Sequence, residues 1–178
     1  KMKIAVYCSS SDNLDPLYYQ QAEELGKWIG SCNHTLVYGG ASCGLMEAVA
    51  KGVRKGGKGN IVGIVPHILA DRNLVSSLPD TIIWCNDLTE RKQIMMQESD
   101  IFIAMPGSIG TLDEAFSVMA QHIIGIDRKM VIFWNINGFW DELFNLFDAL
   151  KQKGVVNKPM GQLYTVAETF DDITKLIL

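Results

Sequence analysis

The feature that most constrains the fold is an alternation of short apolar segments with longer amphipathic ones along the chain. Most short segments are apolar on both faces, which is typical of buried strands in a parallel sheet. The longer segments have the apolar spacing of helices that cover a sheet. The predicted strands are KIAVYC, TLVYGG, NIVGIVP, TIIWC, DIFIAMP and KMVIFWN, and the predicted helices span residues 16–29, 45–55, 88–98, 112–124 and 140–153.

Strand–helix alternation of this kind predicts an α/β fold in which helices flank both faces of a parallel β-sheet, a three-layer sandwich. The chain has 178 residues, enough for one domain with a substantial core. It contains no internal repeat and no linker, so we expect a single domain over residues 1–178. The segment from His67 to Asp80 has weaker periodicity and is predicted to be a loop with a short helix.

The composition excludes several classes of protein. Apolar residues make up 48% of the chain, which predicts a globular core and not a disordered chain. A formal charge of −4 argues against a general nucleic-acid binder but leaves room for one small anionic ligand. The four cysteines form no CxxC pair and the three histidines are scattered, so we expect no metal and no cofactor.

The same features predict where the protein works. Cysteines without a pairing pattern are typical of reduced, mostly buried thiols in a cytoplasmic protein. The apolar start is too short for a signal peptide, and Pro66 and His67 interrupt the other long apolar run. We therefore expect a cytoplasmic protein that does not associate with a membrane.

Ligands of parallel α/β sheets bind beyond the carboxyl ends of the strands. Three loops at this edge are rich in Gly or Ser and lead into helices: CSSSDN, YGGASCGLM and PGSIGTLDE. They follow the first, second and fifth predicted strands. The candidate substrate- or phosphate-binding residues of the first two loops are Ser9, Ser10, Gly39 and Gly40.

The third loop, PGSIGT, has the pattern of an anion site. Gly107 and Gly110 can adopt positive φ and let a ligand approach the backbone. Thr111 is predicted to open a helix whose free N–H groups favour an anion, and Ser108 and Thr111 add hydroxyl donors. An ordinary strand-to-helix turn is the alternative, but two glycine loops in one chain favour phosphate. GGASCG lacks the GxGxxG spacing, so a dinucleotide site is weakly supported.

Glu114 has two interpretations that the sequence leaves open. Thr111 and Glu114 fit a capping box, in which the glutamate closes the helix start. Alternatively, a carboxylate in the first helical turn lies within reach of whatever the loop binds. Asp113 is more simply a solvated residue that favours a helix start.

The segment NDLTERKQIMMQ predicts a helix that begins at Asp87 or Thr89. Arg91 and Lys92 then fall near its N-terminus, where the helix dipole disfavours a cation by ~0.3–1 kcal/mol. A solvated surface pair is one interpretation. A neighbouring anion or carboxylate is the other, since a guanidinium is suited to both.

Together, YGGASCGLM, ERK and PGSIGTLDE resemble the motifs of the LOG family, the cytokinin riboside 5′-monophosphate phosphoribohydrolases. The family signature PGGxGTxxE follows an ERK-type helix and an earlier YGGGxxGLMG loop, and the similarity covers nearly the whole chain in the same order. Members have often carried the label "lysine decarboxylase", which the sequence does not support, because it shows no context for a pyridoxal phosphate lysine. The resemblance implies a Rossmann-like fold and a homodimer or an assembly of dimers, with active sites near the dimer interface.

The resemblance also implies an activity, hydrolysis of the N-glycosidic bond of AMP or a cytokinin riboside monophosphate to free base and ribose 5-phosphate. It assigns Arg91 and Glu114 as the catalytic pair, and Gly107, Ser108, Gly110 and Thr111 as holders of the phosphate. Lys92, near the same helix start as Arg91, is a further candidate phosphate-binding residue. The chain departs from the motifs at Ser108, Ala41 and Glu47, each of which replaces a family glycine. If position 108 requires positive φ, serine there is strained.

Three functions of different classes follow from these patterns. The leading one is a nucleoside-monophosphate phosphoribohydrolase in which Glu114 stabilises positive charge at the anomeric carbon and activates water. The second is a non-catalytic nucleotide-binding or carrier protein of the same fold. The third, an NAD-dependent oxidoreductase, is weakened by the missing fingerprint.

Overall fold

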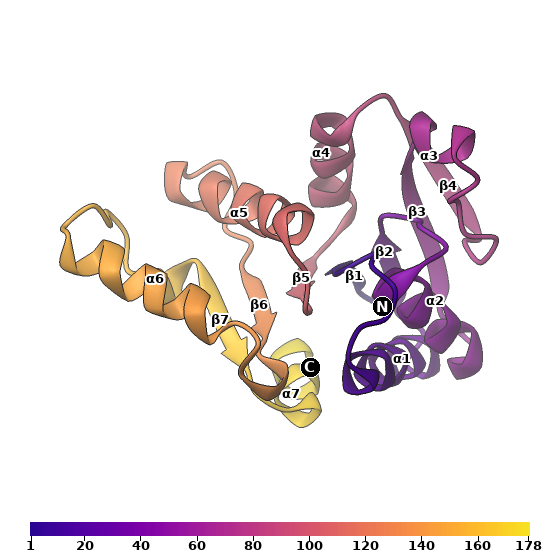
Figure 1. The fold of residues 1–178 in the computed structure, drawn as a ribbon, viewed down its shortest axis with the longest axis horizontal. Coiled ribbons are helices and arrows are strands. Elements are labelled where there is room, and N and C mark those ends of the chain that lie inside the picture. Colours follow the sequence, from indigo (N-terminus) through magenta and orange to yellow (C-terminus); the bar gives the residue numbers. More distant parts are fainter.

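The computed structural model describes residues 1–178 and consists of one seven-stranded sheet with helices on both faces (Figure 1). Every neighbouring pair of strands is parallel, in the order β4-β3-β2-β1-β5-β6-β7. The predicted α/β Rossmann-like architecture is therefore confirmed.

The strands are β1 (Lys3–Tyr7), β2 (Thr35–Tyr38), β3 (Asn60–Pro66), β4 (Thr81–Cys85), β5 (Ile101–Ala104), β6 (Val131–Trp134) and β7 (Tyr164–Ala167). The α-helices are α1 (Pro16–Ser31), α2 (Gly44–Gly56), α3 (His67–Asp71), α4 (Leu88–Glu98), α5 (Ile109–Ile124), α6 (Asp141–Gln152) and α7 (Phe170–Ile177). Two short 3₁₀ helices, η1 (Ile136–Gly138) and η2 (Met160–Gln162), complete the structure.

The two faces of the sheet carry separate buried apolar clusters, because side chains alternate along each strand. In β1, Ile4 and Val6 pack toward α1, α2 and α7, whereas Ala5 and Tyr7 pack toward α4, α5 and α6. Figure 1 shows α1 and α2 on one side of the sheet and α4 and α5 on the other. The strands β2 and β6 are buried throughout, which explains their continuous apolar sequences.

The predicted strands and helices all form, and the short helix predicted after His67 is α3. The C-terminal pair β7 and α7 is absent from the prediction. Its signals are the β-branched run of β7 and a capping box at the start of α7, in which Thr169 and Asp172 bond each other's backbone N–H. The other difference that matters is α5, which begins at Ile109 and not at 112.

The order of the strands determines where a ligand can enter. From β1 the chain builds β2, β3 and β4 outward on one side, then returns to add β5, β6 and β7 on the other. The loops that follow β1 and β5 therefore diverge at the carboxyl edge of the sheet, which is the topological switch point of this architecture.

No helix combines the length and the apolar character needed to cross a membrane.

Candidate active site

A cavity of about 170 Å³ lies at this switch point, between the loops after β1, β2 and β5 and the start of α4. Most of the predicted site residues line it, namely Ser9, Ser10, Arg91, Ser108, Gly110, Thr111 and Glu114. The lining residues absent from the prediction are Cys8, Ser11, Ala41 and Met46. Cys8 and Met46 are apolar and buried, so no polar pattern in the sequence marks them.

Backbone hydrogen bonds hold the loops of the cavity together. Ser9 N–H donates to the carbonyl of Pro106 at 3.0 Å, which joins the loop after β1 to the loop after β5. Leu45 N–H donates to the carbonyl of Ser9 at 2.9 Å, which joins the same loop to the start of α2. The floor of the cavity is therefore set by main-chain contacts.

The glycine loop differs from the predicted one in its helix start and in the role of its glycines. Ser108, not Thr111, is the N-cap of α5, and its side chain makes no capping hydrogen bond. Gly107 and Gly110 can adopt positive φ, but neither does so here. Gly107 is needed for space instead, because a Cβ there would lie 2.0 Å from Thr111 Oγ1. Ser108 has φ −123°, so serine at this position carries no left-handed strain.

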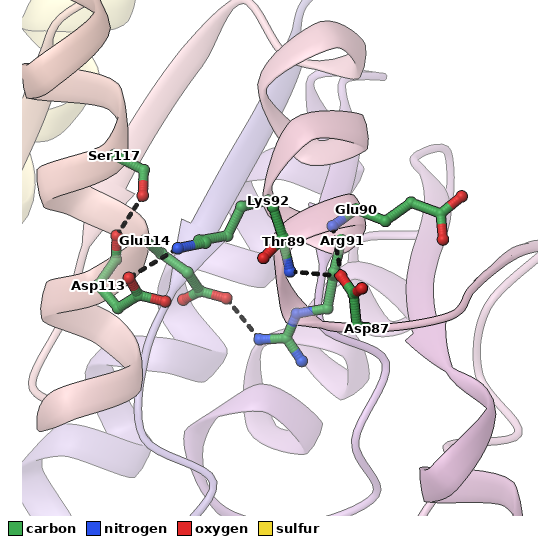
Figure 2. Close-up of polar contacts among 8 residues, drawn as sticks. All are labelled: Asp87, Thr89, Glu90, Arg91, Lys92, Asp113, Glu114 and Ser117. Carbon is green, nitrogen blue, oxygen red and sulfur yellow. Dashed lines mark hydrogen bonds and ion pairs between the residues drawn. The ribbon is translucent and has the colours of Figure 1, made fainter.

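Glu114 is buried in α5 and accepts a hydrogen bond from Arg91, with 2.5 Å between Oε1 and Nη2 (Figure 2). The capping-box interpretation is therefore wrong. Because α5 begins at Ile109, Thr111 lies inside the helix, and Glu114 lies beyond the first turn. From there its carboxylate points across to α4 and not back to its own helix start.

Arg91 reaches Glu114 from the first half of α4, whose start is fixed by side chains. Asp87 is the N-cap, and its carboxylate accepts from the N–H groups of Thr89 and Glu90 at 2.8 and 2.9 Å. The Glu90 carboxylate accepts from the backbone and side-chain amides of Asn86, one residue before the cap. Asp87 is thus confirmed as the helix start and Thr89 is not.

The remaining predicted residues lie outside the cavity lining. Lys92 donates to Asp113 Oδ1 at 2.7 Å. Gly39 packs beside Arg91, where a Cβ would lie 3.3 Å from Nη1. Gly40 has φ 73°, and a Cβ there would meet Val65 Cγ2 at 2.4 Å, so only glycine fits this turn.

Comparisons with known proteins agree with these motifs. Residues 46–177 match the model of a family described as "possible lysine decarboxylase". The cytokinin riboside 5′-monophosphate phosphoribohydrolase LOG3 of Arabidopsis thaliana is 34% identical over 173 residues, 97% of this chain and 80% of that protein. The chain belongs to the LOG family. The phosphoribohydrolase LOG4 of the same plant, also a LOG-family protein, is 33% identical over 173 residues, again 97% of this chain and 80% of the other.

Solved structures share the fold of this LOG-family chain. The molybdenum cofactor binding protein of Rippkaea orientalis has a TM-score of 0.74 at 24% identity, covering 99% of this chain and 95% of the other. The molybdenum cofactor carrier protein of Chlamydomonas reinhardtii has a TM-score of 0.74 at 22% identity, covering 99% and 96%. At these identities the likeness extends to the architecture alone.

The electrostatics of the LOG-family site follow from the burial of its carboxylate. Burial raises the pKa of Glu114 above its ordinary value of 4.5, and the Arg91 guanidinium opposes this rise. Burial, together with the charge of Glu114, also raises the pKa values of the Tyr7 phenol and the Cys8 thiol, so both stay neutral. Glu114 is therefore the acidic group of the cavity, and the only charge that contacts it directly is Arg91.

Proposed function

We propose that this protein hydrolyses the N-glycosidic bond of adenosine-type nucleoside 5′-monophosphates, cytokinin riboside 5′-monophosphates among them, and releases the free base and ribose 5-phosphate. One observation carries the proposal: a buried carboxylate, Glu114, is held by Arg91 in the same cavity as the start of α5. The names of the relatives LOG3 and LOG4 support the substrate class.

The start of α5 suits the phosphate. The first N–H groups of a helix have no partner within the helix, and the helix dipole favours negative charge there. Ser108 leaves its hydroxyl free of any capping bond, and the Thr111 hydroxyl lines the same cavity. A phosphate bound here would hold the nucleotide by one end and so set the position of the sugar.

Glu114 then acts on the anomeric carbon. As the bond from this carbon to the base nitrogen breaks, its electron pair leaves with the base and positive charge develops on the sugar. The carboxylate stabilises this charge and takes a proton from the attacking water, whose oxygen forms the new bond to the carbon. The base gains a proton from the solvent as it leaves, and the proton that Glu114 takes from the attacking water returns to the solvent, so one water is consumed overall. Arg91 contacts only Oε1 of Glu114, so Oε2 has no partner within the chain and can serve the water.

A homodimer or an assembly of dimers forms part of the proposal. An apolar groove of about 390 Å³ runs between α5 and α6, with Phe116, Ile123 and Leu146 exposed along it. Exposed apolar surface of this kind is typical of a protein interface. Light scattering tests it: a mass of twice the chain or more is expected, and a fully active monomer would contradict it.

The activity is tested by incubating the protein with AMP, with isopentenyladenosine 5′-monophosphate and with adenosine, and by following free base and ribose 5-phosphate by chromatography. We expect base from the monophosphates and little from adenosine, because adenosine lacks the phosphate. The ratio between the two monophosphates measures the preference for a cytokinin. Binding of both nucleotides without any base release would instead indicate a carrier protein of the same fold.

A further inference from the structure

Two ion pairs join α4 to α5 next to each other (Figure 2). Arg91 pairs with Glu114 at 2.5 Å, and the next residue, Lys92, pairs with the preceding one, Asp113, at 2.7 Å. The first pair is inside the cavity. The second lies outside it, with the side chain of Lys92 19% exposed and that of Asp113 47% exposed.

Apolar packing fixes the first half of α4 only weakly. The only buried residues of this helix are Met95 and Met96, in its second half. Residues 88–94, which include Arg91, are exposed or half-buried. Polar contacts must therefore determine where Arg91 lies relative to Glu114. Besides their own bond there are the Asp87 cap, the contacts between Asn86 and Glu90, and the Lys92–Asp113 pair, and of these only the last reaches α5.

A second ion pair from the neighbouring residue adds a constraint that one pair cannot supply. Consecutive residues of an α-helix point about 100° apart, since one turn takes 3.6 residues. Two pairs from Arg91 and Lys92 therefore fix the rotation of α4 about its axis as well as its distance from α5.

We propose that Lys92 and Asp113 are positioning residues, which hold α4 so that Arg91 meets Glu114, and that Lys92 does not bind the substrate phosphate. The effect on turnover rests on the proposed function. Neither residue lines the cavity that Arg91 and Glu114 line. A half-exposed ion pair contributes only ~0–1 kcal/mol to stability. A shift of about 1 Å in a catalytic group can still lower turnover by about 100-fold.

The test compares Lys92→Met, Asp113→Asn and the double variant with the wild type, measuring kcat with AMP and the Kd of AMP by calorimetry. We expect each single variant to lose about 10- to 100-fold in kcat with little change in Kd. The double variant loses no more than the worse single one, because the two residues act as one pair. Lys92→Arg, which can still pair with Asp113, recovers most of the activity.

Lys175→Met is the matched control, because it breaks the exposed pair between Lys175 and Asp171 on α7, away from the site. We expect it to keep full activity. The proposal is overturned if Lys92→Met clearly weakens AMP binding while Asp113→Asn keeps wild-type kcat, since Lys92 would then bind phosphate. Losses that multiply in the double variant would also overturn it.

A second measurement keeps the proposal testable if the wild type releases no base, an outcome that defeats the proposed function alone. The side-chain Nε–H signal of Arg91 can be followed by NMR and assigned by its loss in Arg91→Lys. We expect a sharp, shifted signal in the wild type and in Lys175→Met, and a signal close to that of free arginine in Lys92→Met and Asp113→Asn. An unchanged Arg91 signal in the last two variants contradicts the positioning role.

Discussion

Arg91 Nη2 lies 2.5 Å from Glu114 Oε1, and this contact joins α4 to α5 at the topological switch point of the sheet, between β1 and β5. The contact is buried: the side chains are 12% and 4% exposed. A buried ion pair recovers little of the free energy lost on desolvation, so its presence does not by itself indicate a stabilising role. A buried carboxylate that lines a cavity beside a guanidinium is better explained by chemistry, because stability is commonly reduced at catalytic sites.

The first prediction concerns stability. Because burial raises the folded-state pKa of Glu114, its contribution to stability is fully present below the unfolded-state pKa and is lost as pH rises through the folded-state value. Glutamine does not ionise, so Glu114→Gln does not lose stability in this way as the pH rises. We therefore expect the free energy of unfolding of the variant, relative to wild type, to increase from about pH 4 to pH 7.

Chemical denaturation across this pH range measures the trend. The trend matters more than the absolute difference, because glutamine also leaves Arg91 without its counter-charge. Glu23→Gln serves as the control, because hydrogen bonds from Lys55 and Lys27 lower the pKa of Glu23, so the relative free energy of unfolding of this variant should fall over the same pH range. A fall of this kind in Glu114→Gln would mean that the ion pair, and not burial, controls the pKa of Glu114.

Two glycines of one loop should respond differently to alanine. A methyl group at Gly107 would meet Thr111 Oγ1 at 2.0 Å, so Gly107→Ala should destabilise the protein by about 1–3 kcal/mol. Gly110 has free space and a helical backbone, so Gly110→Ala should be neutral or stabilise by about 0.4–1 kcal/mol. Thermal unfolding of the two variants measures the difference. Equal losses of stability would contradict the close packing of Gly107 against Thr111.

Ser108 should matter for the ligand and not for the fold. Its φ of −123° is outside the left-handed region and its hydroxyl caps nothing, so Ser108→Gly should relieve no left-handed strain. Ser108→Ala should melt like the wild type but bind AMP more weakly, by the ~0.5–1.5 kcal/mol of one hydrogen bond. Calorimetry measures the binding. Unchanged affinity in Ser108→Ala would remove this hydroxyl from the phosphate site.

The cap of α4 should influence activity beyond its effect on stability. Asp87→Ala removes the acceptor for two backbone N–H groups and should cost about 0.5–2 kcal/mol of stability. Thr169→Ala removes the cap of α7 and should cost a similar amount. Only Asp87→Ala should also lower kcat, because Arg91 lies in the next turn of the same helix. Equal kcat values in the two variants would show that the start of α4 does not position Arg91.

The sequence predicts the architecture well because burial leaves a clear pattern. The strands around β1 are apolar on both faces. Helix α4 begins at Leu88 and ends at Glu98, the bounds that its sequence pattern predicts. The start of α5 is harder, because Ser108 and Thr111 are both good N-caps and only the tertiary contact of Glu114 with Arg91 separates them. The prediction lacks the pair β7 and α7, although Thr169 and Asp172 have the spacing of a capping box.

The sequence indicates most of the residues that line the candidate site, but it does not indicate which of them contact one another. Arg91 and Glu114 are 23 residues apart, and neither propensity nor spacing indicates that they touch. Lys92, a predicted phosphate ligand because a cation near a helix start suits an anion, pairs with the Asp113 carboxylate, and the sequence does not indicate this contact either. Gly39, which stays a predicted ligand contact, lies against the guanidinium of Arg91.

The most direct measurement is base release from AMP by the wild type and by Glu114→Gln at saturating nucleotide, with the Kd of AMP measured alongside. General acid–base catalysis contributes about 10²–10⁴ in rate, so the variant should lose turnover by that factor while its Kd stays close to the wild-type value. Turnover in Glu114→Gln within a few-fold of wild type would contradict the role of Glu114, and with it the proposed mechanism.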